Sequence, residues 1–143
     1  MGELRYTIEI PAPRARVWAC MLDDATYRDW TTAFHPGSYY EGEWRTGADM
    51  RFLGPDGGGM RARIERADAP EYVSIEHLGE LRAGTATDPT DWVGAYERYY
   101  FHEQVDGGTK LDVELLGVPD EYTPMMNEMW PPALERLRQI CVG

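Results

Sequence analysis

The sequence predicts an α+β fold in which a curled antiparallel sheet of about seven strands wraps around one long C-terminal helix. Over residues 123–142, apolar side chains recur at three- and four-residue steps, which is the period of one helical face. Seven earlier stretches have strand length, and most are rich in aromatic or β-branched residues. A meander of seven strands is too wide to stay flat, and only the C-terminal helix is long enough to cover its concave face.

The N-terminal part of the chain predicts one strand followed by two short helices. Apolar and polar side chains alternate over residues 4–10, as is typical of a half-buried strand. After a turn bounded by prolines, an apolar stripe predicts a helix over residues 14–22. A second, short helix is predicted over residues 25–33, where aromatic residues recur at a helical step.

Six further strands follow, separated by turns that are rich in glycine, proline and aspartate. They are predicted over residues 38–44, 48–53, 60–66, 72–81, 93–103 and 109–117. Links this short join antiparallel hairpins. The polar connection 82–92 is longer, and we interpret it either as a gate at one end of a cavity or as a surface loop that tolerates length.

The C-terminal helix carries two local signals. The pair Thr123-Pro124 is a start signal, with Thr123 as the predicted N-cap residue. Pro131 and Pro132 remove two amide donors from the helix interior. Because the apolar stripe keeps its phase across both prolines, one kinked helix is predicted, and a break that starts a second helix at Pro132 is the alternative.

Composition limits the classes of function. A chain of 143 residues is expected to form one domain, 1–143. The net charge of −11 argues against nucleic acid and against anionic membrane surfaces as partners. No apolar run has the length of a secretory signal or a membrane span, so a cytoplasmic location is expected. Cys20 and Cys141 are predicted to be buried thiols, and without a CxxC pair neither a metal site nor a cofactor is expected.

Strand parity predicts which side chains face the concave side, because alternate residues of a strand point to opposite faces. For the four unambiguous strands the inward set is Ala48, Met50, Phe52, Met60, Ala62, Ile64, Val73, Ile75, His77, Gly79, Leu81, Leu111, Val113 and Leu115. Lys110, Asp112 and Glu114 are expected outside.

The strand 93–103 is ambiguous, because both of its faces carry aromatic and charged residues. Pairing through the turn 106–108 sets Phe101 opposite Leu111 and Glu97 opposite Leu115. That register places Glu97 and Tyr99 inward, and it leaves the outward-facing Arg98 and His102 in solvent, in keeping with the rarity of unpaired buried arginine.

His77 and Glu97 are the candidate catalytic residues. On adjacent strands with inward side chains they are predicted to be cross-strand neighbours. A buried carboxylate needs a charged partner or hydrogen-bond donors, and a histidine beside it supplies one. The pair is interpreted either as a polar anchor or general acid–base couple, or as a structural pair that fixes the register of the sheet.

A ligand cavity is predicted where helix and sheet do not touch. A face rich in methionine and tryptophan adapts to irregular space, so a small hydrophobic or aromatic molecule is the expected partner. The predicted apolar walls are Trp30, Met50, Phe52, Ile75, Met126, Met129 and Trp130, and the predicted polar anchors are His77, Glu97 and Tyr99.

The order of short motifs resembles a known superfamily. The stretch PAPRARVWACMLDDATYRDW is similar to the START-like, SRPBCC superfamily. The later part of the chain resembles the subfamily related to the activator of heat shock protein 90 ATPase. The stretches that carry this resemblance are EGEWRTGADMRFLG, GGGM, SIEHLGEL, YERYYF, GGTKLDVEL and MWPPALERL. The resemblance covers nearly the whole chain and implies a helix-grip (START-like) fold with a hydrophobic cavity.

The resemblance does not select one function, because this scaffold carries lipid-binding proteins, polyketide cyclase-like enzymes and co-chaperones. Ligand binding is therefore the leading hypothesis. One alternative is a chaperone ATPase activator-like module that binds another protein through its surface. The other is an enzyme of the cyclase or hydratase type, in which His77 and Glu97 move protons inside the same cavity.

Overall fold

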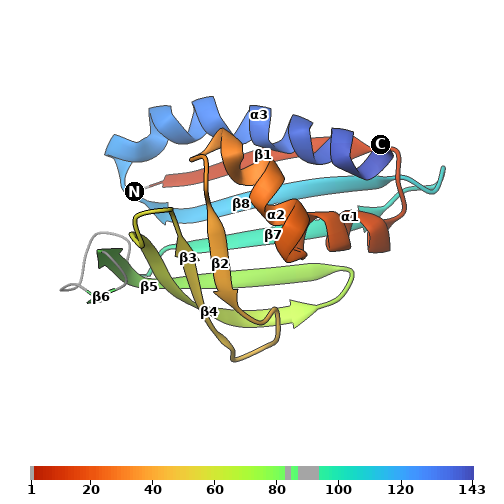
Figure 1. Cartoon of the computed structure of the whole chain (residues 1–143). Helices are drawn as coiled ribbons and strands as arrows, with labels where there is room; N and C mark the ends of the chain where they lie inside the picture. Colours follow the sequence, from red (N-terminus) through yellow and green to blue (C-terminus); the bar gives the residue numbers. More distant parts are fainter. Residues whose placement is uncertain (1, 83–84, 87–93) are drawn as a thin grey trace.

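The computed structural model describes residues 2–82, 85–86 and 94–143, and these form a curled antiparallel sheet with helices packed against one face (Figure 1). The strands are β1 (Gly2–Ile10), β2 (Tyr39–Gly42), β3 (Asp49–Leu53), β4 (Gly59–Asp68), β5 (Tyr72–Arg82), β6 (Thr85–Ala86), β7 (Tyr96–Glu103) and β8 (Thr109–Val118). The helices are α1 (Arg14–Leu22), α2 (Asp24–Trp30), η1 (Thr31–Ala33), η2 (Asp120–Tyr122) and α3 (Thr123–Val142), where η marks a 3-10 helix.

The sheet has the order β1-β8-β7-β5-β4-β3-β2, and every pairing along it is antiparallel. The first strand therefore pairs with the last, while α1 and α2 carry the chain from that edge to β2 at the other edge (Figure 1). The α+β helix-grip fold predicted from the sequence is confirmed, with β6 as a short addition that pairs with β5. Most of the predicted gate, residues 83–84 and 87–92, lies outside the described residues.

The register predicted for the ambiguous strand is confirmed. Glu97 lies opposite Leu115, and Phe101 lies opposite Leu111. Most of the side chains assigned to the concave face form the core, in which Ala62, Val113 and Leu111 have no exposed surface. Burial of each large apolar side chain contributes about 1.5–3 kcal/mol, so this face is the main source of stability.

α3 runs without a break through Pro131 and Pro132, so the alternative of two helices is wrong. Both prolines are exposed, as are Asn127 and Glu128, whose carbonyls lose their helical partners. On this exposed side of the helix the carbonyls can bond to water, while the opposite side of α3 stays packed on β1, α1 and α2.

The predicted N-cap of α3 is corrected. Tyr122 is the N-cap residue, Thr123 is already helical, and no side-chain hydrogen bond caps this end. The 3-10 turn η2 replaces the cap, with the Tyr122 amide donating to the Pro119 carbonyl at 2.9 Å. The chain thus enters α3 through a tightened turn that satisfies backbone groups without a capping side chain.

Cys20 on α1 and Cys141 on α3 are free and buried, as predicted. Burial, together with the neighbouring Cys20 thiol, raises the pKa of Cys141 to about 12. The Cys141 thiol therefore stays protonated at neutral pH, and both cysteines act as small apolar groups where the two helices meet. Among the described helices, none is both long and apolar enough to cross a membrane.

Candidate functional site

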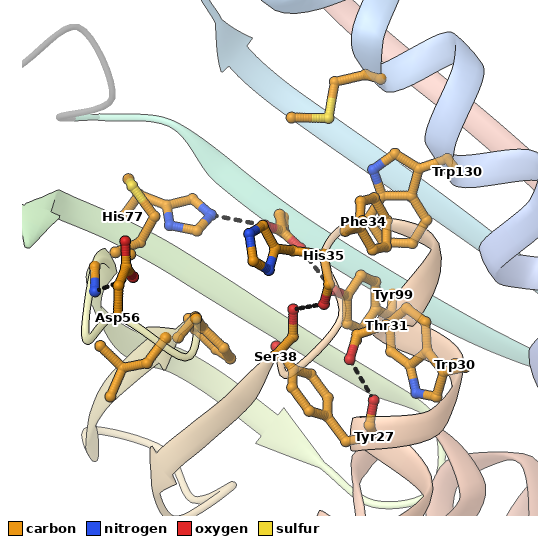
Figure 2. A pocket seen from close by; sticks show the side chains of 18 residues that line it. Tyr27, Trp30, Thr31, Phe34, His35, Ser38, Asp56, His77, Tyr99 and Trp130 are labelled. Carbon is orange, nitrogen blue, oxygen red and sulfur yellow. Dashed lines mark hydrogen bonds and ion pairs between the residues drawn. The ribbon is translucent and has the colours of Figure 1, made fainter.

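A cavity of about 440 Å³ lies between the sheet on one side and α2, η1, the loop after η1 and α3 on the other (Figure 2). Seven of the predicted site residues line it, namely Trp30, Phe52, His77, Glu97, Tyr99, Met126 and Trp130. The cavity therefore combines aromatic side chains from helices and sheet with one polar group of residues on β5 and β7.

The polar group centres on the carboxylate of Glu97. His77 Nε2 lies 2.9 Å from Glu97 Oε1, and the Tyr99 hydroxyl donates to Oε2 at 2.6 Å. Ile75 is the residue directly opposite Glu97, so His77, two residues further along β5, is its diagonal neighbour on the same face. Each carboxylate oxygen of Glu97 thus has one protein partner in this group.

The charge of Glu97 is maintained despite its enclosure. Burial acts to raise its pKa, but the hydrogen bond and charge of His77 and the hydrogen bond from Tyr99 outweigh burial and hold the pKa below 4.5. Burial, followed by the charge of Glu97, raises the pKa of Tyr99 well above 10. At neutral pH Glu97 is therefore a carboxylate and Tyr99 is a hydrogen-bond donor.

Part of Glu97 remains open to the cavity. Its side chain keeps 26% of its surface exposed, whereas that of His77 keeps 5%. Because Glu97 lines the cavity, the exposed part of its side chain is available to a bound molecule. An ionised carboxylate offers about four acceptor positions, and two are used here, so the group can accept further hydrogen bonds or exchange a proton with a ligand.

A cluster of aromatic rings adjoins this polar group in the cavity wall. The ring of Trp130 lies 4.9 Å from that of Phe34, 6.1 Å from that of Trp30 and 6.2 Å from that of Tyr99, measured between centroids. Trp30 is oriented by its indole N–H, which donates to the Met21 carbonyl at 3.0 Å. Rings fixed by such contacts give the cavity a rigid apolar surface.

Two loops that are far apart in the sequence contribute to the lining of the cavity. In the first, which follows η1, the Ser38 hydroxyl donates to the His35 carbonyl at 2.6 Å. In the second, the β3–β4 turn, the Gly58 amide donates to Asp56 Oδ1 at 2.8 Å. A Cβ atom on Gly54 would lie 3.9 Å from His35 Nδ1, which shows how closely the two loops approach.

Three residues predicted as cavity wall lie elsewhere. Met50 and Ile75 face inward as their parity requires, but each is only 1% exposed and belongs to the packed core. Met129 is half-buried on α3 and does not line the cavity, because it precedes Trp130 by one residue and so points to another side of the helix. The cavity occupies one part of the concave face. Strand parity predicts which side chains face that side, but not which of them border the cavity.

Several lining residues were not assigned to the cavity from the sequence. They include Tyr27, Thr31, Phe34, His35, Ser38 and Asp56. The three-residue spacing of Tyr27 and Trp30 was a usable signal, because it places both on one face of α2. His35, Ser38 and Asp56 lie in loops, where no periodicity indicates direction. In the described ranges, no group of three or more His, Cys, Asp or Glu residues is placed to hold a metal ion.

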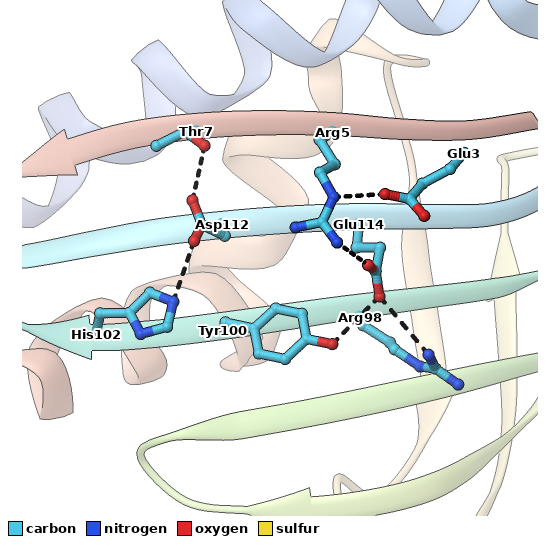
Figure 3. A network of polar contacts seen from close by, with 8 residues as sticks. All are labelled: Glu3, Arg5, Thr7, Arg98, Tyr100, His102, Asp112 and Glu114. Carbon is cyan, nitrogen blue, oxygen red and sulfur yellow. Dashed lines mark hydrogen bonds and ion pairs between the residues drawn. The ribbon is translucent and has the colours of Figure 1, made fainter.

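A second buried glutamate, Glu114, lies on the outer face of the sheet (Figure 3). Its carboxylate lies 2.5 Å from Arg5 Nη2 and 3.6 Å from Arg98 Nη1, and the Tyr100 hydroxyl donates to it at 3.2 Å. Glu114 and Arg98 lie on the outer face, as strand parity predicts, but Arg98 is half-buried rather than in solvent. Glu114 is 6% exposed because these long side chains lie over it.

The chain matches the model of one protein family over residues 11–141, and that family is described as activator of Hsp90 ATPase homolog 1-like protein. No curated protein matches the sequence.

Solved structures share the fold at low sequence identity. The Aha1 dimer from Colwellia psychrerythraea has a TM-score of 0.77 and 16% identity, covering 99% of this chain and 96% of that one. CalU16 from Micromonospora echinospora has a TM-score of 0.70 and 18% identity, covering 97% and 75%. DynU16, from the dynemicin biosynthetic locus, has a TM-score of 0.70 and 17% identity, covering 96% of this chain but only 46% of DynU16. At these identities the likeness concerns the fold.

Proposed function

We propose that this chain, which belongs to the family of activator of Hsp90 ATPase homolog 1-like proteins, binds a small hydrophobic or aromatic molecule in the cavity beside α3. The observation that carries the proposal is the cavity itself. About 440 Å³ stays open on a concave face whose other side chains pack into a core. This volume lies within the range of small-molecule sites, about 300–1,000 Å³.

The lining supports a ligand with an apolar body. Six aromatic side chains contribute to the wall, namely Tyr27, Trp30, Phe34, Phe52, Tyr99 and Trp130. A few polar groups, with Glu97 at their centre, would orient the ligand, which is the usual division of labour in such sites.

Two hairpin turns of the same geometry provide a matched test. In the β3–β4 turn the Gly54 amide donates to the Gly58 carbonyl at 2.8 Å, and in the β7–β8 turn the Gln104 amide donates to the Gly108 carbonyl at 2.9 Å. Only the first turn lines the cavity. A Cβ on Gly54 would meet atoms no closer than 3.6 Å, so this position accepts a side-chain Cβ, and His35 lies within 4 Å of it.

The variant Gly54→Leu adds a large side chain to the lining of the cavity, and Gln104→Leu places the same side chain in the corresponding turn away from it. Isothermal titration calorimetry with naphthylethanol, an uncharged two-ring probe, is expected to show at least a tenfold weaker affinity for Gly54→Leu and an unchanged affinity for Gln104→Leu. Tenfold corresponds to about 1.4 kcal/mol, the scale of one obstructed contact. Equal binding by all three proteins would place the ligand outside this cavity.

A second candidate function is activation of a chaperone ATPase through a protein–protein contact. The description of the matched family favours it, and the Aha1 dimer shares the fold. Among the described residues, the large apolar side chains that are exposed are Val105, in the β7–β8 turn, and Val142, at the end of α3. Such a partner would therefore contact mainly charged and polar surface.

The measurement for this second function is the ATP turnover of an Hsp90-type chaperone with increasing amounts of the protein. A rise in turnover that saturates and survives Gly54→Leu would favour the surface contact over the cavity. Unchanged turnover at every concentration would remove this candidate.

A further inference from the structure

We infer that the ligand of this cavity carries a positive charge, as a protonated or quaternary amine attached to an apolar body. The inference rests on the proposed function and names the chemical class of its ligand. It follows from the balance of charges around the cavity, from the open part of Glu97 and from the surrounding rings.

The charges that line the cavity are unbalanced. Glu97 and Asp56 contribute carboxylates, whereas none of the lining residues that the structure describes is lysine or arginine. His35 and His77 are the lining side chains that can become cationic, and His77 Nε2 is already engaged with Glu97. A ligand carboxylate or phosphate would meet the carboxylates of Glu97 and Asp56, and no lining arginine or lysine could pair with it, which is unfavourable.

Glu97 is equipped to receive a cation. Its lowered pKa keeps it ionised at neutral pH, and 26% of its side chain is exposed at the cavity. Its two protein partners, His77 and Tyr99, occupy one position on each oxygen, which leaves acceptor capacity for the N–H groups of an amine or the charge of a quaternary nitrogen.

The aromatic wall favours the same class of ligand. The faces of tryptophan and tyrosine rings attract cations, and enclosing rings are a recurring means of binding ammonium groups. Tyr99 contributes both a ring of the wall and the hydroxyl that holds Glu97, so the rings and the carboxylate form one surface. The chain as a whole carries a net charge of −11, which raises the local concentration of cations further.

The test uses three probes that share a naphthyl body and differ in charge, namely naphthylethylamine, naphthylethanol and naphthylacetate. At pH 7 the amine is protonated and the acetate is ionised. Calorimetry with the unmodified protein is expected to give the amine at least a tenfold tighter affinity than the alcohol, with the acetate weakest. An amine no tighter than the alcohol, or an acetate that binds most tightly, would overturn the inference and leave the proposed function standing.

Two variants assign the preference to Glu97. Glu97→Gln removes the charge and is expected to bring the affinities of the amine and the alcohol to within about twofold of each other, because the amide cannot form an ion pair with the amine. Glu114→Gln removes a buried carboxylate from the outer face and should leave the amine preference intact. Persistence of the full preference in Glu97→Gln would show that another group recognises the cation.

The remaining outcomes are also informative. Tyr99→Phe keeps the carboxylate charged and frees one acceptor position, so the amine preference should survive in it even where Glu97→Gln is too unstable to study. If none of the three probes binds the unmodified protein, the cation inference fails for two-ring ligands and the proposed function loses its support at the same time. If the alcohol binds and the amine does not, the proposed function keeps its support and the inference that the ligand is cationic is wrong.

Discussion

Glu97 and Glu114 lie on neighbouring strands and face opposite sides of one sheet, and their surroundings differ. Glu114 is directly opposite Arg98 and also contacts Arg5 and Tyr100, so fixed cations neutralise it. Glu97 has His77 and Tyr99 as partners and keeps 26% of its side chain exposed at the cavity.

The difference distinguishes a carboxylate that fixes structure from one that remains available to a ligand. A glutamate saturated by arginines gains little from another partner and loses much when a partner is removed. A glutamate held by a histidine and a tyrosine, with acceptor positions left over, can bind something more. The charge on one face is thus expected to matter for stability, and the charge on the other for recognition.

The largest expected effect on stability is that of Glu114→Gln. Loss of the charge leaves Arg5 and Arg98 without their shared carboxylate, and we expect the free energy of unfolding to fall by about 2–3 kcal/mol. Urea denaturation followed by circular dichroism at pH 7 measures this. Glu43→Gln is the control, because its contact with Arg45 is exposed and should contribute less than about 1 kcal/mol. Equal losses in the two variants would remove the distinction between the faces.

For Glu97→Gln we expect a smaller loss in the free energy of unfolding, about 1.5 kcal/mol at pH 7, because the amide keeps an acceptor for one of the two partners. This loss should depend on pH. The pKa of Glu97 is lowered in the folded protein, so its charge stabilises the fold above the ordinary value of 4.5, and that contribution disappears as the pH falls through the lowered value. Urea midpoints of both proteins should therefore converge in acid. A difference that stays constant or grows below pH 4.5 would contradict this assignment.

The smallest effect is expected for Tyr99→Phe, which removes one hydrogen bond to Glu97 and about 1 kcal/mol of stability. The same change should raise the pKa of Glu97, because the donor that favours its charged form is lost. Titration of the Glu97 carboxyl carbon by NMR measures the shift. Tyr100→Phe removes the corresponding donor from Glu114 and should leave the Glu97 titration unchanged.

The sequence predicts the polar group of the cavity because alternation and pairing are local rules. Once the turn 106–108 sets Glu97 opposite Leu115, the parity of β5 places His77 on the same face. The burial of Glu114 escapes those rules, since parity predicts a direction but not what lies over an outward side chain. These rules do not predict the positions of His35 and Asp56 either, because loops have no period. How closely the two loops approach each other depends on how strongly the sheet curls.

The most direct test of the cavity is an NMR titration of protein with labelled methionine methyl groups, using naphthylethanol as the ligand. Met60 and Met126 line the cavity, whereas Met21 and Met50 are buried in the core and Met129 lies on another side of α3. We predict that the Met60 and Met126 signals shift with ligand concentration and saturate together, while the Met21 signal does not move. Saturable binding that leaves both Met60 and Met126 unchanged would contradict the account.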